Sequence, residues 1–168
     1  MAGNKPRKKP TSRHIKIRYA TYQDLPALLY LVESGFGEDR FSSSQVNYLL
    51  MKAHATVYII EFKRKVVGSA IMLWRKNSAT GRLYSIVIDP VFHGLGLGSR
   101  LLEVCESTAA KQGCRSVALE VRVDNVRGIA LYEKFGYQST GIIRGYYADG
   151  MNGLKMVKRL QKGSRRSR

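Results

Sequence analysis

The chain has 168 residues, of which 44% are hydrophobic, and a formal net charge of +17 at pH 7. This length favours a single domain with an ordinary apolar core. No apolar run of about 18 residues occurs and no apolar segment follows the basic N-terminus, which argues against a membrane-spanning helix and a secretory signal and favours a cytoplasmic protein.

The positive charge is concentrated at the two ends of the chain. Residues 1–13 carry five Lys and Arg side chains and residues 155–168 carry seven, with no acid in either segment. These twelve charges leave +5 of the +17 for residues 14–154. We therefore expect a folded domain over residues 14–160, between a basic disordered tail at 1–13 and a second basic tail at 161–168. Such tails favour contact with RNA or a ribosome, although solvated ends without a partner explain them equally well.

The first half of the chain alternates between helix and strand patterns. Thr21 and Asp24, three residues apart, are typical of a capping box before a helix. Ser42 to Ser44 can cap a second helix. Three segments rich in β-branched and aromatic residues then indicate strands. The predicted elements are strand 15–19, helix 25–34, helix 44–53, and strands 56–62, 66–74 and 82–88.

The second half begins with a helix from about Leu97 that Gly113 ends, with an apolar face at helical spacing. The predicted elements that follow are strand 116–122, helix 125–135, and strands around 137–147 and 153–160. The early strands suggest antiparallel pairing, and the strand–helix–strand order suggests parallel pairing. The expected fold class is therefore α/β, with a mixed, mostly antiparallel central sheet flanked by helices.

A glycine-rich loop lies between the strand at 82–88 and the next helix. Gly94, Gly96 and Gly98 let a phosphate approach the backbone, and the free N–H groups at the helix start favour an anion. Three glycines are also compatible with a merely flexible turn. A Walker loop is excluded, because Ser99 and Arg100 follow the last glycine where Lys and then Ser or Thr are needed. A Rossmann fingerprint is disfavoured, because the spacing is GxGxG and five residues separate it from the strand.

The segment VIDPVFHGLGLGSRLL resembles the acetyl-CoA loop of GNAT acetyltransferases. Gly96 and Gly98 match that loop, whereas His93 stands where Gln or Arg is usual. The resemblance implies acetyl-CoA as co-substrate, with a pantetheine arm along the preceding strand and a pyrophosphate on the loop. The residues implied in binding are Ile86, Val87, Ile88, His93, Gly94, Leu95, Gly96, Leu97, Gly98, Ser99 and Asn125.

Residues 119–137, LEVRVDNVRGIALYEKFGY, and residues 145–150, GYYADG, resemble RimI-type ribosomal-protein and archaeal protein N-terminal acetyltransferases. This resemblance implies a single GNAT domain in which Glu120 is the general base, acting through a water, and Tyr132 is the acid that protonates coenzyme A. Judged alone, Glu120 reads as a solvent-facing or ion-paired residue and Tyr132 as a core residue. Together, and in register with a cofactor loop, they favour direct acetyl transfer to an amine.

The acceptor is less well determined than the chemistry. The resemblance places Phe36, Tyr146 and Tyr147 at the peptide entrance, but the acidic pair usual after GYYADG is replaced by Met151 and Asn152. A protein α-amine, with a pKa near 7.7–8.0 against about 10.4 for lysine, is the leading acceptor, and a ribosomal protein is one candidate. The alternatives are lysine or a small amine, or an acetyl-CoA-binding module that acts on RNA or ribosomes through its tails. Three scattered histidines and two cysteines give no metal-site spacing, and we expect no metal.

Overall fold

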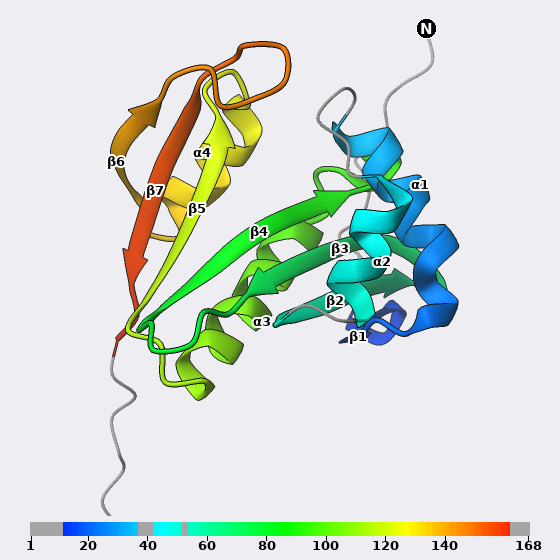
Figure 1. The fold of residues 1–168 in the computed structure, drawn as a ribbon. Helices are drawn as coiled ribbons and strands as arrows, with labels where there is room; N and C mark the ends of the chain where they lie inside the picture. The colour runs from blue at the N-terminus through cyan, green and yellow to red at the C-terminus, as the bar shows by residue number, and fades with distance from the viewer. Residues whose placement is uncertain (1–11, 37–41, 52–53, 162–168) are drawn as a thin grey trace, which may run out of the picture.

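The central sheet divides into two halves that diverge from each other (Figure 1). The computed structural model describes residues 12–36, 42–51 and 54–161, which form a seven-stranded sheet in the order β1-β2-β3-β4-β5-β7-β6. Only the β4–β5 pair is parallel among these strands, which confirms the mixed, mostly antiparallel sheet. The strands are β1 (Ile15–Tyr19), β2 (Ala55–Phe62), β3 (Lys65–Leu73), β4 (Thr80–Ile88), β5 (Ser116–Arg122), β6 (Gln138–Ile143) and β7 (Gly153–Arg159).

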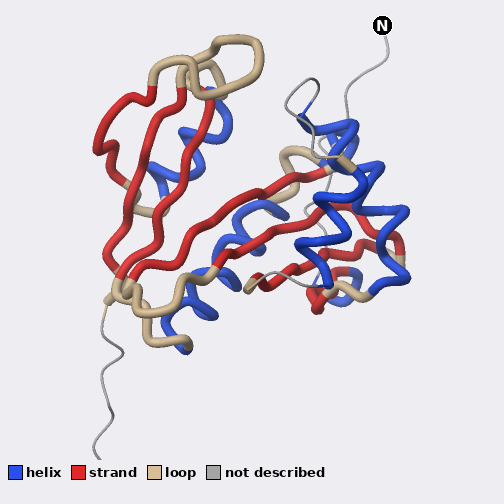
Figure 2. The backbone as a smooth tube through the Cα atoms, viewed as in Figure 1, coloured by secondary structure: helices blue, strands red, loops and turns tan. Residues whose placement is uncertain are grey.

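Helices cover both faces of the sheet (Figures 1 and 2). The pair α1 and α2 covers one face of the half formed by β1 to β4, and α3 lies on the opposite face, as does α4 beside β5. Two buried clusters result, one under α3 and α4 and one under α1 and α2. The helices are α1 (Leu25–Phe36), α2 (Ser43–Met51), α3 (Leu97–Lys111) and α4 (Val126–Lys134), with short 3-10 helices η1 (Ser12–His14), η2 (Tyr22–Asp24) and η4 (Pro90–Phe92).

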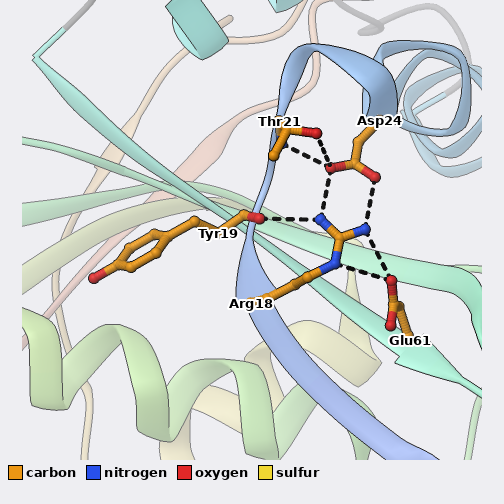
Figure 3. Close-up of polar contacts among 5 residues, drawn as sticks. All are labelled: Arg18, Tyr19, Thr21, Asp24 and Glu61. Carbon is orange, nitrogen blue, oxygen red and sulfur yellow. Dashed lines mark hydrogen bonds and ion pairs between the residues drawn. The ribbon is translucent and has the colours of Figure 1, made fainter.

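A charged network fixes the entry into α1 (Figure 3). The Arg18 guanidinium on β1 donates to both oxygens of Asp24, at 2.8 and 2.9 Å, and to Glu61 of β2 at 2.9 Å. Asp24 also accepts from the backbone N–H of Thr21 at 2.7 Å, as the predicted capping box requires. Hydrogen bonds from Arg18 and Thr21 outweigh burial and lower the pKa of Asp24. The network ties β1 and β2 to the helix that contributes to the cleft described below.

A β-bulge in β4 changes which residues face each layer. Ile71 pairs with Ser85 and Met72 with Leu83, so Tyr84 has no opposite residue on β3. Before the bulge, Leu83 belongs to the buried cluster under α3 and α4. After the bulge, Ile86 and Ile88 pack against that cluster. Tyr84 packs on the α1 and α2 side. Strict alternation from the sequence would have placed Leu83 and Val87 on one face, but Val87 lies against Gly35 of α1.

The predicted elements and the observed ones differ mainly after α4. The sequence predicts a strand at 137–147, but β6 ends at Ile143. Gly145 and Gly150 have φ values of 58° and 84°, which turn the chain back toward β7. The GYYADG segment is therefore a loop. Of the predicted tails, Ser12, Arg13 and Gln161 lie in the described part of the structure, and the other tail residues lie outside it.

Candidate active site

The two halves of the sheet separate to form a cleft. β4 and β5 pair from Thr80 opposite Ser116 to Leu83 opposite Leu119, and the strands diverge beyond that point (Figure 1). The cleft between them has a volume of about 1120 Å³. Its walls are the second half of β4, the glycine loop, the end of β5, α4 and the β6–β7 loop, with Ser34, Gly35 and Gln45 on the α1–α2 side.

One end of the cleft is suited to an anion. Gly94 and Gly96 have φ values of 79° and 76°, a conformation that costs other residues roughly 1–2 kcal/mol. Gly96 is the N-cap of α3, and the first helical hydrogen bond runs from Arg100 N–H to its carbonyl at 3.2 Å. The N–H groups at the start of this 15-residue helix therefore point out of the helix without an intrahelical acceptor. These groups and the helix dipole favour a phosphate, as the glycine spacing predicts. Leu97, Gly98 and Ser99 line the cleft here.

Two side chains, those of Asp89 and His93, fix the segment that leads into the glycine loop. The buried Asp89 accepts from the Val91 N–H at 3.0 Å. The His93 ring bonds to the Ile88 carbonyl at 2.8 Å, so this residue holds the loop against β4 while also lining the cleft. Leu95, also in the predicted binding set, packs against the α3 cluster instead and is not among the lining residues.

The cleft edge of β4 is open for backbone pairing. Ile86, Val87 and Ile88 pair with β3 on one side, and β5 has diverged on the other. Because a strand presents N–H and C=O groups on both edges, this edge can receive an extended ligand with amide groups. All three residues line the cleft.

Glu120 lies on β5 one residue beyond Leu119, the last residue of β5 that pairs with β4, and 16% of its side chain is exposed. Its Oε2 accepts from Arg82 Nε at 3.1 Å and lies 3.0 Å from Arg82 Nη2. The same Nη2 donates to the Tyr146 hydroxyl at 2.9 Å. Burial opposes the charge of Arg82, but Glu120 and Tyr146 outweigh it and raise the pKa of the guanidinium. Sequence reasoning missed Arg82, because its partners are 38 and 64 residues away.

Tyr132 projects from α4 into the same cleft. The residue is 7% exposed, and its ring meets Tyr137 edge-on at a centroid distance of 5.7 Å. Its hydroxyl makes no hydrogen bond to any residue that the structure describes. Burial raises the pKa of this phenol above its ordinary value. Tyr132 is therefore a protonated donor at neutral pH.

Asn125 has a clear structural role in addition to lining the cleft. It is the N-cap of α4, and its side-chain oxygen accepts from the Gly128 N–H at 2.9 Å. An added Cβ at Gly128 would lie 2.7 Å from the Asn125 amide nitrogen. The cap thus fixes the start of the helix that carries Tyr132.

The β6–β7 loop closes the other side of the cleft. Tyr146 and Tyr147 meet edge-on at a centroid distance of 5.0 Å. Arg122 of β5 anchors the loop, since its Nη2 lies 2.6 Å from Asp149 and its guanidinium stacks 5.0 Å from the Tyr147 ring. Both tyrosines line the cleft, and their contact with a peptide stays a prediction; the third predicted contact, Phe36, ends α1 and its side chain lies outside the described part.

Within residues 12–36, 42–51 and 54–161, no helix is long and apolar enough to cross a membrane, and no three His, Cys, Asp or Glu side chains are grouped so that they could hold a metal ion. Neither cysteine lines the cleft. Cys105 is a fully buried residue of α3, and burial raises the pKa of its thiol to about 12. A thiolate nucleophile is therefore not available at this site from the chain's own cysteines.

Comparisons with known proteins agree on one family. Residues 21–137 match the model of the acetyltransferase (GNAT) family. The chain is 32% identical over 128 residues to the [ribosomal protein bS18]-alanine N-acetyltransferase of Escherichia coli, covering 74% of this chain and 81% of that protein. It is 31% identical over 103 residues to an uncharacterised N-acetyltransferase of Methanocaldococcus jannaschii, of which it spans 65%. The crystal structure of the Escherichia coli ribosomal-protein-S18-alanine N-acetyltransferase superposes with a TM-score of 0.79 at 25% identity, covering 92% of this chain and 99% of that one.

Proposed function

Because this chain belongs to the acetyltransferase (GNAT) family, we propose that it transfers the acetyl group of acetyl-CoA to the α-amine of a protein N-terminus. The observation that carries this proposal is the presence of Glu120 and Tyr132 in one cleft with an anion-binding glycine loop. A carboxylate that can accept a proton and a phenol that can donate one are the two groups that amine acetylation requires.

The cleft fits acetyl-CoA in two respects. The N–H groups at the start of α3 suit its pyrophosphate, and Gly94 and Gly96 leave open space there, because an added Cβ at either would meet nothing within 4 Å. The free edge of β4 suits the amide groups of its pantetheine arm. When bound, the thioester would supply the activated acetyl group.

In the proposed reaction, Glu120 accepts a proton from the attacking amine, through a water, as the amine forms a bond to the acetyl carbon. Tyr132 donates its proton to the sulfur as the carbon–sulfur bond breaks. The enzyme then returns to its starting state when the proton on Glu120 leaves to solvent and Tyr132 regains one. The buried or half-buried positions of both cysteines support direct attack without an acyl-enzyme.

A protein N-terminus is favoured as acceptor by two arguments. Its α-amine has a pKa of about 7.7–8.0, so a substantial fraction is neutral at pH 7 and a modest base suffices. The name of the Escherichia coli relative specifies a ribosomal-protein alanine, a residue whose acceptor group is an α-amine. Tyr146, Tyr147 and Arg82 would then contact the first residues of the peptide.

The test is coenzyme A release with peptides that carry free N-termini, beside N-terminally blocked peptides that contain lysine. Turnover on free N-termini alone supports the proposal, and turnover on blocked lysine peptides alone would replace it with lysine acetylation. Silence on both, despite acetyl-CoA binding, would favour a small-amine acceptor or a binding module. A Glu120→Gln variant, which keeps the shape of the site, is expected to bind acetyl-CoA normally and to lose about 100-fold in kcat.

A further inference from the structure

Five cationic side chains gather at one corner of the sheet. Arg13 and Lys16 belong to η1 and β1, and Lys63, Arg64 and Lys65 belong to the β2–β3 turn and its flank. All five are exposed. The two segments lie together, because the Lys63 N–H donates to the His14 carbonyl at 2.9 Å, and four of the five line a shared hollow. We call these five residues the basic edge.

The positive charge of the basic edge is only weakly compensated. The carboxylate that lines the same hollow belongs to Glu61, and it is held by Arg18 at 2.8 Å (Figure 3). The charges of the basic edge therefore face solvent together. Further along the chain toward the N-terminus, Lys5, Arg7, Lys8 and Lys9 add four more in the sequence. Like charges so close repel each other, which opposes folding rather than aiding it.

The turn itself is conformationally unfavourable for its residues. Phe62 pairs with Lys65, so Lys63 and Arg64 form a two-residue hairpin turn, with φ values of 49° and 69°. Such turns favour Asn-Gly, because both positions need positive φ. At the opposite end of β3, the chain uses Asn77 at its positive φ of 62°. Lys63 and Arg64 thus occupy positions where backbone conformation and charge both disfavour them, and strain of this kind gathers at functional positions.

We propose that the basic edge binds the phosphodiester backbone of a nucleic acid, as a surface separate from the cleft. Lysine and arginine contacts to phosphates supply affinity without reading sequence. The neighbouring aromatic rings support this mode rather than base stacking, because both are half-buried and carry a cation each: Lys63 lies 5.6 Å from the Phe62 ring and Lys65 lies 5.6 Å from the Phe92 ring. This binding does not depend on the proposed acetyl transfer.

The decisive variant is Lys63→Asn/Arg64→Gly in the full chain. It removes two cations and installs the residues that the turn prefers, so the melting temperature should stay equal or rise. Affinity for a short fluorescent single-stranded RNA, measured by anisotropy, should fall about tenfold near 0.15 M salt, and the slope of log K against log salt should shrink by about 1.4. The same titration with duplex DNA compares the affinities of the basic edge for the two nucleic acids, and binding of either supports the proposal.

The matched control is Arg75→Gln/Lys76→Gln in the exposed β3–β4 turn, which removes the same charge at the other end of β3. This variant should bind RNA within about twofold of the original chain. Equal loss in both double variants would overturn the proposal, since net charge alone would then account for binding. An unchanged affinity in Lys63→Asn/Arg64→Gly would also overturn it, as would tight binding of polyglutamate with no binding of RNA or DNA.

Discussion

Replacing Tyr132 by phenylalanine separates the chemistry of the cleft from its packing. The ring contact with Tyr137 at 5.7 Å survives this change, because only the hydroxyl is removed. That hydroxyl makes no hydrogen bond to a described residue. The free energy of unfolding should therefore change by less than about 1 kcal/mol, in either direction.

The expected loss is in turnover. A positioned general acid contributes about 10²- to 10⁴-fold, which corresponds to roughly 2.7–5.5 kcal/mol of transition-state stabilisation. Because burial raises the pKa of Tyr132, its hydroxyl stays protonated in the original chain across the neutral range. The fold-loss in kcat should therefore be the same from about pH 6 to pH 9.

The assay is steady-state coenzyme A release at saturating acetyl-CoA, with urea unfolding of the same samples. Tyr137→Phe is the matched control, since it removes a buried phenol from the adjacent ring, which does not line the cleft. This control should keep kcat within about threefold of the original. A Tyr132→Phe variant at full rate, or equal losses in the two variants, would refute the assignment of Tyr132 as the acid.

Three further outcomes follow from the geometry. Gly96→Ala and Gly113→Ala both place alanine at positive φ and should each cost about 1–2 kcal/mol of stability, but only Gly96→Ala should weaken acetyl-CoA binding measured by calorimetry. Asp24→Asn should lower the free energy of unfolding by about 2 kcal/mol at pH 7, measured by urea unfolding. Folding lowers the pKa of Asp24, so the stability that its carboxylate contributes is present above the unfolded pKa of about 3.9. The difference in stability between the variant and the original chain should therefore shrink as the pH falls below about 4. Cys105, with a pKa raised by burial to about 12, should react with a thiol reagent at pH 8 only after unfolding, as counted by mass spectrometry.

The sequence predicts most of the fold because its signals are local. Turn and cap residues such as Thr21, Asp24 and Gly113 act within a few positions of themselves, and the observed elements begin and end close to them. The strand predicted at 137–147 ends early, at Ile143, for a related reason. Tyr146 and Tyr147 have strand propensity, but Gly145 and Gly150 adopt positive φ and the loop is held by Arg122 from another strand.

The site is predictable only where a motif carries it. The glycine loop was predicted from its residue spacing, and Glu120 and Tyr132 from the resemblance of residues 119–137 to known acetyltransferases; all of them line one cleft. Arg82 and Arg122 were not found, because each acts on partners that only the tertiary fold brings near. His93 occupies a position of the binding motif and lines the cleft, but only the structure shows that its ring also hydrogen-bonds to the Ile88 carbonyl; its contact with the coenzyme stays a prediction.

The bulge at Tyr84 explains why the cleft opens beside Glu120. The last β4–β5 pair joins Leu83 to Leu119, so the next residues in register would be Tyr84 and Glu120. Because Tyr84 is the extra residue of the bulge, β4 twists away there and its onward edge loses β5 as a partner. Arg82, one residue before the last pair, still reaches across to Glu120 at 3.0 Å and to Tyr146 at 2.9 Å. The bulge in β4 thus frees a backbone edge for the coenzyme. It also leaves Glu120, the proposed base, at the point where β4 and β5 diverge, where Arg82 of β4 still contacts it.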